Sequence, residues 1–301
     1  MSVSVVMPNY NNARFIEHCL RSLAGDTAIS EIVIYDNGST DGSIAVIEKV
    51  SDPRVRLVRG THNLGATLGR HAAIEHSTND HICFVDGDDF LGPQAVSQAW
   101  AQMEREQLDI SLFRMFNVNR DGDDPTLFLA PPLNPIDGRT ACEMTLGSWR
   151  IHIWGIIRKS IYEKAFAGFT PHGYSDDEYL TRLILLSANR VGGSHGDMFY
   201  RVIPKEATPQ RVVGGLRTAI RVLKAASDAG LNVEALRQQR NNTLRYLLGM
   251  TRRAPGNALY REQLADLAKA YADIRPLPWK TADLPLRLAE TAVRAVARLK
   301  A

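Results

Sequence analysis

The chain has 301 residues, of which 45% are hydrophobic and 23% are charged, a composition typical of a globular protein with one large or two smaller domains. No apolar stretch approaches the roughly 20 residues of a membrane span, and a first strand expected from Ser2 leaves no room for a signal peptide. The three cysteines, Cys19, Cys83 and Cys142, are too widely spaced for a metal motif or a disulfide framework. We therefore expect a cytoplasmic protein.

The net charge of +3 combines two parts of opposite sign. Residues 1–210 hold 19 Lys+Arg and 26 Asp+Glu, giving −7, and residues 211–301 hold 17 and 7, giving +10. A basic C-terminal third is typical of a chain with an anionic neighbour, such as a membrane surface, a polyanionic acceptor or nucleic acid. Solvated helix faces are the alternative. No nucleic-acid-binding module is recognisable, so nucleic acid is not an expected partner.

The first hundred residues alternate between strand and helix patterns. Strands are expected at 3–7, 31–35, 55–58 and 82–85, and helices at 13–23, 43–50 and 68–76. This alternation predicts a parallel sheet with helices on both faces, in which ligands bind at the carboxyl ends of the strands. Polar or glycine-containing segments follow all these strands, which makes that edge the expected binding site.

The second half of the chain is less regular. Residues 117–139 are rich in Asp, Pro, Asn and Gly and predict a long loop. Ordered structure is expected again over 149–187, a late strand over 198–203, and helices from about 211 to the end. We therefore expect a domain boundary near residue 210.

Three carboxylates follow the strand expected at 82–85, in the run Asp86-Gly87-Asp88-Asp89. They repel one another unless a cation lies between them. Oxygen ligands on a short loop suit Mg²⁺ or Mn²⁺, which commonly bind one or two carboxylates together with substrate phosphates. An acidic turn is the alternative, because Gly-Asp-Asp is also good turn chemistry.

Four segments, in this order, resemble the inverting glycosyltransferase family 2. They are Val3–Asn12, Val33–Gly42, Asn63-Leu64-Gly65 followed by Arg70, and Asp86–Asp89. The likeness spans about residues 2–100 and continues more weakly through Trp154-Gly155, 176–180 and Tyr200-Arg201. It implies the α/β GT-A fold, a Rossmann-like nucleotide-binding mixed sheet flanked by helices, here with a helical C-terminal region. It also implies that 1–100 bind a nucleotide sugar, that 101–210 bind the acceptor, and that 1–210 form the catalytic domain.

The resemblance implies a donor site built from the strand ends. Its expected residues are Pro8, Asn9, Tyr10 and Asp36 around the nucleoside, with Asn63, Gly65, Arg70, Asp86 and Gly87 completing the site. A carboxylate can accept the ring N–H of uracil, glycine allows close backbone approach, and arginine can reach a diphosphate. The alternatives are packing for Tyr10, an ordinary turn for Asp36 and a surface charge for Arg70.

The same resemblance divides the metal-binding work between two carboxylates. Asp88 is expected to hold Mn²⁺ or Mg²⁺ directly, and Asp86 to contact the ribose or the waters of the metal. Asp89 is expected to cap the next helix or orient the loop. His195 is a weaker third-ligand candidate, since a lone histidine is more often structural.

An inverting transfer also needs a base that takes the proton of the acceptor hydroxyl. Asp176-Asp177-Glu178-Tyr179-Leu180 matches the family's Glu-Asp-x-x-Leu element, which makes Asp177 the expected base. The family's glutamate is replaced by Asp176, which keeps Asp176 as the second candidate. The alternative is an acidic helix N-terminus that complements the helix dipole.

Candidate acceptor residues are mostly aromatic. Trp149, His152 and Trp154 could stack on a sugar ring or belong to the core, and His172 could contact acceptor or phosphate. The Gln-x-x-Arg-Trp element of the processive relatives is absent from the sequence. The expected reaction is therefore the addition of a single sugar.

Residues 284–301 predict a basic amphipathic helix. Arg287, Arg294 and Arg298 share one face, opposite an apolar face. Such a helix can lie in an anionic membrane interface at the inner face of the membrane. The alternative is packing on its own domain or on a second copy of the chain as a homo-oligomer.

Together these features predict a metal-dependent inverting glycosyltransferase. It would move one hexosyl or N-acetylhexosaminyl group from a nucleotide diphosphate sugar, expected to be a UDP-sugar, to a glycan or lipid-linked hydroxyl. The family resemblance implies that this acceptor belongs to surface polysaccharide or glycolipid synthesis. A catalytically inactive nucleotide-sugar-binding scaffold is the first alternative. A nucleotidyltransferase is less favoured, because residues 8–12 lack the Gly-rich, basic loop that holds a triphosphate.

Overall fold

The computed structural model describes residues 2–147, 150–173, 175–203, 208–253 and 291. Trp149 lies outside this part of the chain. The predicted C-terminal helix at 284–301 also lies outside it, except for residue 291. The chain divides into two compact units. The first unit comprises residues 1–141, 150–169 and 184–204, and the second comprises 142–149, 170–183 and 205–301. The domain boundary near residue 210 stays a prediction. So does the division of residues 1–210 into a donor-binding half and an acceptor-binding half.

The first unit begins with the expected parallel strands. They are β1 (Val3–Asn9), β2 (Ile29–Asp36), β3 (Val55–Arg59) and β4 (His81–Phe84), in the spatial order β3-β2-β1-β4. The connecting helices are α1 (Ile16–Leu23), α2 (Ser43–Glu48) and α3 (Ala66–Glu75). The predicted elements are confirmed here, with bounds that differ by at most three residues.

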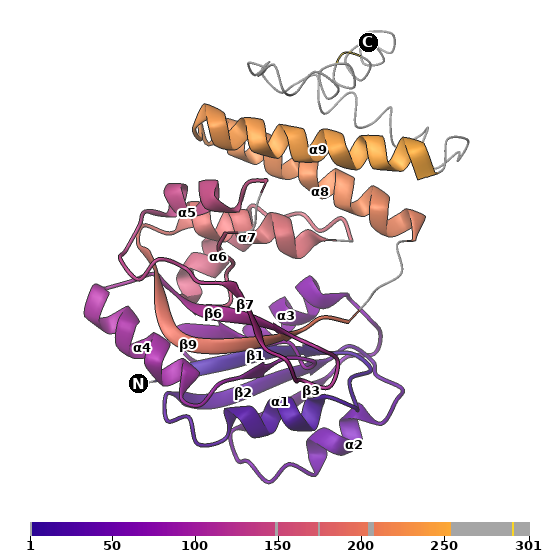
Figure 1. Cartoon of the computed structure of the whole chain (residues 1–301). Coiled ribbons are helices and arrows are strands. Elements are labelled where there is room, and N and C mark those ends of the chain that lie inside the picture. The colour runs from indigo at the N-terminus through magenta and orange to yellow at the C-terminus, as the bar shows by residue number, and fades with distance from the viewer. Residues whose placement is uncertain (1, 148–149, 174, 204–207, 254–290, 292–301) are drawn as a thin grey trace. The chain divides into compact units, whose positions relative to one another are not determined.

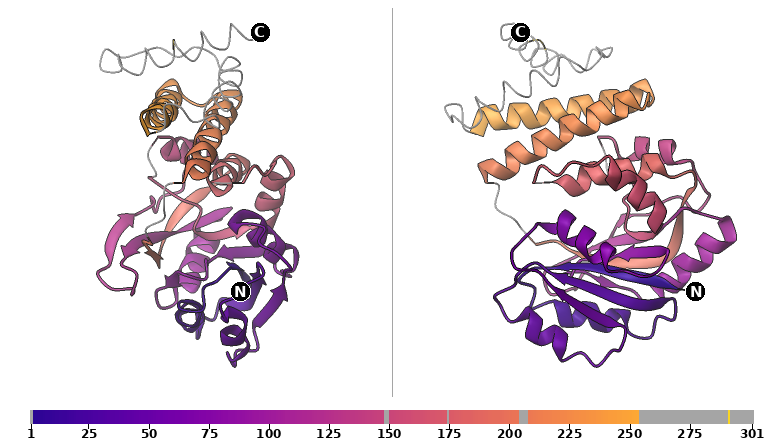
Figure 2. Two further views of the ribbon diagram at one scale, coloured as in Figure 1. Left: turned by 90° about the vertical axis from the view of Figure 1, so that its right-hand side faces the viewer. Right: turned by 180° about the vertical axis from the view of Figure 1, so that it is seen from behind.

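Burial explains why this part of the sheet forms. Strand β1 is buried along its whole length, as a central strand covered on both faces should be. Helix α1 buries Ile16, Cys19, Leu20 and Leu23 along one stripe. Helices α1 and α2 cover one face of these strands and α3 covers the other (Figures 1 and 2). The helices thus flank the faces of the sheet, and the carboxyl ends of the strands form the edge at which ligands are expected.

Beyond β4 the sheet becomes mixed. It continues in the order β4-β8-β6-β9-β5, with β7 beside β6. Its further strands are β5 (Phe90–Leu91), β6 (Ile110–Val118), β7 (Thr126–Leu129), β8 (Gly155–Arg158) and β9 (Val191–Arg201). Strand β8 runs antiparallel to β4 and β6, whereas β6 and β9 are parallel. The mixed sheet implied by the resemblance is thus confirmed, and the parallel pattern of the first hundred residues ends at β4, because the later strands are not linked by consecutive βα units. Helices α4 (Ala95–Glu106) and α6 (Lys159–Ala167) pack beside them.

The prediction of one long loop at 117–139 is wrong in part. Strand β6 runs to Val118, β7 lies inside the segment, and α5 (Gly138–Thr145) begins at its end. Strand β7 is an edge strand whose Leu127 and Phe128 stay exposed, so it lacks the alternating pattern of a half-buried strand.

Strand β9 is longer than the predicted 198–203, because the glycines in its first half weaken the strand pattern in the sequence. A side chain at Gly193 would place its Cβ 2.5 Å from the Pro131 carbonyl oxygen. Glycine is depleted in strands and so argues against one in a sequence. Here the close approach of another backbone requires it.

The described part of the second unit is helical. It contains the start of α7 (Asp176–Ser187) together with α8 (Pro209–Asp228) and α9 (Val233–Arg253), which pack against each other (Figure 1). Thr208 caps α8 by accepting a hydrogen bond from the Arg211 amide, with Pro209 in the first turn. The expected helices after residue 211 are confirmed as far as Arg253. No helix in the described part of the chain has the length and apolar character to cross a membrane.

Candidate active site

The ends of β1 and β2 meet as the sequence predicts. Asn9 pairs with Asp36 in the sheet register, and its Nδ2 donates to Asp36 Oδ1 over 2.7 Å. Asp36 is fully buried and also accepts from Ser39 Oγ at 2.6 Å, Ser39 N at 2.9 Å and Gly38 N at 3.1 Å. Four hydrogen bonds use the acceptor positions of a carboxylate. Asp36 therefore holds the turn at 37–39 together, and its contact with a nucleobase stays a prediction.

The other predicted donor residues lie on the turns beside this pair. Pro8 is buried and Tyr10 is 44% exposed, so the Tyr10 ring offers a surface on which a planar base could stack. Asn63 Oδ1 accepts from the Gly65 amide at 2.8 Å, and Gly65 enters α3 with a φ of +82°. That backbone conformation is accessible mainly to glycine.

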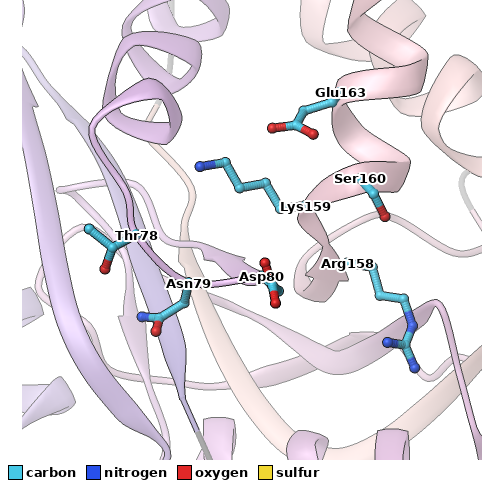
Figure 3. Close-up of a pocket in the computed structure, with 7 residues that line it drawn as sticks. All are labelled: Thr78, Asn79, Asp80, Arg158, Lys159, Ser160 and Glu163. Carbon is cyan, nitrogen blue, oxygen red and sulfur yellow. The ribbon is translucent and has the colours of Figure 1, made fainter.

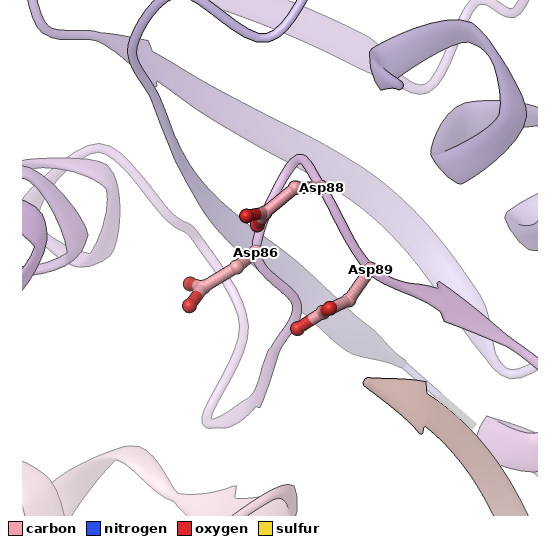
Figure 4. Close-up of side chains that lie close together, drawn as sticks. All are labelled: Asp86, Asp88 and Asp89. Atoms are coloured by element: carbon pink, nitrogen blue, oxygen red, sulfur yellow. The ribbon is translucent and has the colours of Figure 1, made fainter. Parts of the chain in front are cut away.

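The acidic run lies on the loop after β4. One carboxylate oxygen from each of Asp86, Asp88 and Asp89 lies within 4.8 Å of the others. Figure 4 shows the three side chains on this loop. Asp86 and Asp88 are partly exposed, and Asp89 is buried. Asp89 Oδ2 is buried without a hydrogen-bond partner among the described residues. Clustered carboxylate oxygens, one of them without a donor, fit a hard divalent cation such as Mn²⁺ or Mg²⁺.

Electrostatics separate Asp89 from the other two acids. Burial raises the pKa of Asp89 well above its usual range, and the charges of Asp88 and Asp86 raise it further. The Arg201 amide opposes this by donating to Asp89 Oδ1 at 2.8 Å. These contacts support the expectation that Asp89 orients the loop.

Arg70, on α3, forms an ion pair with the acidic loop. Its Nη2 lies 2.6 Å from Asp86 Oδ1, and its guanidinium carbon lies 5.2 Å from the Phe84 ring centroid and 5.1 Å from that of Trp154. Arg70 is only 6% exposed, so the alternative of a helix-surface charge is excluded. Its contact with a diphosphate stays a prediction.

Arg201, at the end of β9, contacts the acidic loop but is not among the residues predicted for the site. It is 3% exposed, its Nη1 donates to the Asp88 carbonyl oxygen at 2.5 Å, and its Nη2 lies 2.5 Å from His18 Nδ1. Its guanidinium also lies over the rings of Phe15 and Phe90, at 5.1 and 4.9 Å. Only the weak Tyr200-Arg201 resemblance pointed to it, because the contact joins residues 113 positions apart in the sequence.

We expect Arg201→Ala to lower the free energy of unfolding by about 2–4 kcal/mol, because a buried charged hydrogen bond and two cation–π contacts are lost. Urea unfolding followed by circular dichroism measures this loss. Arg114→Ala is the matched control from the neighbouring strand, since its ion pair with Asp197 is more exposed and should contribute about 1 kcal/mol or less. Equal losses in the two variants would contradict a special role for Arg201.

His195 is not brought to the acidic loop. It is an exposed residue of β9, six positions before Arg201. Six residues of strand extend about 20 Å. Because Arg201 is the residue of β9 that contacts Asp88 and Asp89, the structure gives His195 no place in the same ligand set.

The candidate bases lie in the second unit, where the structure distinguishes them. Asp176 is 3% exposed, and its carboxylate binds Arg221 and two backbone amides. Asp177 is exposed, and its carboxylate has no hydrogen bond or ion pair with any described residue. Glu178 packs beside Arg182, and burial raises the pKa of Glu178. Asp177 is thus the carboxylate of this turn that is open to an incoming hydroxyl, although its role as base stays a prediction.

The predicted acceptor residues separate into different environments. Trp154 is 7% exposed and packs on Arg70 and Phe84, which matches the alternative of a core residue. The His152 ring stacks on Trp154 at 5.5 Å. His172 is exposed in the second unit, where its amide donates to Asp176 Oδ2 at 2.7 Å.

A polar pocket of about 390 Å³ lies near the amino end of β4, away from the predicted site (Figure 3). Its lining consists of Thr78, Asn79, Asp80, Arg158, Lys159, Ser160 and Glu163. None of the predicted donor, metal or acceptor residues lines it. The acidic loop follows the opposite, carboxyl end of the same strand.

Two named relatives align with more than two thirds of this chain. The chain is 25% identical over 243 residues to the poly(ribitol-phosphate) beta-glucosyltransferase of Bacillus spizizenii, covering 75% of this chain and 37% of that protein. It is 27% identical over 217 residues to the poly(ribitol-phosphate) beta-N-acetylglucosaminyltransferase TarS of Staphylococcus aureus, covering 68% and 36%. The chain therefore spans little more than a third of the length of these relatives.

The fold matches a solved structure of S. aureus TarS residues 1–349 in complex with UDP-GlcNAc. The TM-score is 0.70 at 19% identity, with 99% of this chain and 91% of that one covered. This likeness establishes the expected GT-A fold. The family model for glycosyl transferase family 2 matches residues 4–166, which is more than half of the chain. The chain accordingly belongs to glycosyl transferase family 2.

Proposed function

We propose that the protein is a metal-dependent inverting glycosyltransferase that moves one sugar from a UDP-sugar to an acceptor hydroxyl. The observation that carries the proposal is the cluster of Asp86, Asp88 and Asp89, held by Arg70 and Arg201 at the edge where the β1 and β2 turns also end. Family membership and the UDP-GlcNAc complex of TarS support the choice of donor.

In this proposal the residues of the chain have three roles in the reaction: donor binding, metal binding and base catalysis. The turns at Asn9, Asp36 and Gly65 bind the nucleoside and orient the diphosphate. Asp88, assisted by Asp86, would hold Mn²⁺ or Mg²⁺, which when bound supplies positive charge beside the leaving diphosphate oxygen. Asp177 takes the proton from the acceptor hydroxyl as that oxygen bonds to the anomeric carbon. The bond from the anomeric carbon to the phosphate oxygen breaks on the opposite face, and the nucleoside diphosphate leaves with the electron pair.

For the acceptor, we favour a hydroxyl on a surface glycan or polyol-phosphate polymer. Two relatives are named as poly(ribitol-phosphate) transferases. The net charge of +10 over residues 211–301, from 17 Lys+Arg and 7 Asp+Glu, fits a polyanionic acceptor. The sugar is proposed as hexosyl or N-acetylhexosaminyl.

A thermal-shift screen of nucleotide sugars, with and without Mn²⁺, tests the donor proposal. We expect a UDP-sugar to raise the melting temperature more when Mn²⁺ is present, because a ligand that binds only the folded state stabilises it. A hit is then incubated with the metal, and release of UDP is followed with and without a polyol-phosphate or glycan acceptor. Donor binding without any turnover would instead support the inactive scaffold.

We also propose that residues 284–301 hold the protein at an anionic membrane surface. Deletion of 284–301 should then abolish sedimentation with vesicles that contain anionic phosphatidylglycerol, while binding to neutral vesicles stays low for both forms. A matched control replaces Arg287, Arg294 and Arg298 by Gln and keeps the length of the chain. Unchanged binding of the deletion variant to anionic vesicles would refute the proposal.

A further inference from the structure

The start of α7 is fixed by a buried carboxylate. Asp176 Oδ2 accepts hydrogen bonds from the amides of His172 and Gly173, each at 2.7 Å, and Asp176 Oδ1 lies 3.1 Å from Arg221 Nη1. The side chains of Asp176 and Arg221 are 3% and 17% exposed. A carboxylate this deeply buried requires a partner, and the Arg221 guanidinium of α8 supplies the charge.

Arg221 binds more than the carboxylate. Its Nη2 donates to the Thr170 carbonyl oxygen at 2.5 Å, and its guanidinium lies 4.0 Å from the centroid of the Tyr179 ring. One side chain therefore joins the loop before α7, the first residue of α7 and a residue one turn later. These attachments lie on both sides of Asp177 in the sequence.

The backbone directly before α7 is strained and needs the contacts of Asp176 and Arg221 to keep its conformation. Ser175, directly before α7, has a φ of +62°, a left-handed conformation that is unfavourable for a residue with a side chain. The two hydrogen bonds to Asp176 Oδ2 hold the loop on one side of this strained residue, and the guanidinium of Arg221 holds the helix on the other. Loss of the contacts made by Asp176 and Arg221 would allow the loop to relax and the first turn of α7 to change its direction.

We infer that Arg221 and Asp176 are positioning residues that hold Asp177 in the orientation needed to deprotonate the acceptor. The inference rests on the proposed function, in which Asp177 is the base. A base must lie within hydrogen-bond reach of the hydroxyl, and a displacement of about 1 Å can lower a rate about 100-fold. Neither Arg221 nor Asp176 touches the substrate in this role.

The first experiment separates the chemical step from donor binding. Arg221→Gln should lower kcat about 30- to 100-fold, an estimate based on the cost of misplacement, and leave the KM for the UDP-sugar within about twofold. The affinity for UDP with Mn²⁺, measured by calorimetry, should not change. Lys224→Gln is the matched control, because Lys224 lies one turn further along α8 in an exposed ion pair with Asp228. Its kcat should equal that of the unmodified protein.

Two more variants separate positioning from charge and from folding. Arg221→Lys keeps the charge but lacks the planar fork that reaches Asp176 and Thr170 together, so it should recover only part of kcat. The double variant Asp176→Asn/Arg221→Gln leaves no buried charge without a partner, so its melting temperature should exceed that of Arg221→Gln. Its kcat should stay low.

The result that would overturn the inference is a folded double variant with full kcat, or a loss expressed only in the donor KM. Asp177→Asn, assayed in parallel, identifies which proposal fails. If Asp177→Asn retains full transfer, the base assignment and the positioning role both fall. If it abolishes transfer while the Arg221 variants keep full kcat, the positioning role alone is wrong.

Discussion

Asp88→Ala is expected to lower kcat/KM for sugar transfer about 10³-fold, which corresponds to roughly 4 kcal/mol of transition-state stabilisation. The physical reason is that in the proposed site Asp88, with Asp86, would supply the carboxylate oxygens that hold the metal. Removing one carboxylate leaves too few anionic oxygens to hold a hard cation against water.

The variant should also lose the metal dependence of donor binding. Calorimetric titration with UDP, with and without Mn²⁺, should show a large difference for the unmodified protein and little for Asp88→Ala. Asp228→Ala is a suitable control, because it removes an exposed carboxylate at the end of α8. If the Asp88 variant keeps Mn²⁺-enhanced UDP binding, the acidic cluster is only a turn.

Asp177→Asn carries the second large expected effect, a decrease in kcat of about 10²- to 10⁴-fold, the range typical for loss of a general base. The amide keeps the shape of the side chain but cannot take a proton from a hydroxyl. UDP binding with Mn²⁺ should be unchanged, because Asp177 is not among the residues proposed to hold the donor. The measurement combines steady-state transfer rates with calorimetry.

Asp176→Asn provides the comparison within the same turn. Because Asp176 is buried against Arg221, we expect this variant to lose about 3 kcal/mol of folding stability. Asp177 is exposed, so Asp177→Asn should unfold at nearly the same urea concentration as the unmodified protein. A fully active Asp177→Asn enzyme would refute the assignment of the base.

The sequence predicted the first half of the fold well because each element there carries its own signal. The strands β1 to β4 are short apolar runs that end at turn residues, and α1 has an apolar stripe at helical spacing. In a parallel sheet such strands end at one edge, so the meeting of Asn9 with Asp36 could be expected from chain order alone. The antiparallel insertion of β8 between β4 and β6 could not, since pairing of distant strands leaves no local pattern.

The structure also decided between alternatives for single residues. From the sequence, Arg70 could be a surface charge and Trp154 a sugar platform, yet the two pack together beside Phe84 in the interior. Similarly, Asp176 and Asp177 are chemically alike in the sequence. Their difference arises from Arg221, 45 residues further along the chain, whose guanidinium pairs with the carboxylate of Asp176.

By itself, the sequence determined the family and the strand-end position of the acidic loop at 86–89, because these depend on local motifs in a fixed order. Only the tertiary structure showed that Arg201 ties Asp88 and Asp89 to β9 and that Asp177 stays exposed while its neighbour is buried. The physical reason is that charge pairing and burial depend on which distant elements pack together. The residues close to a position in the sequence do not indicate which distant elements will pack against it.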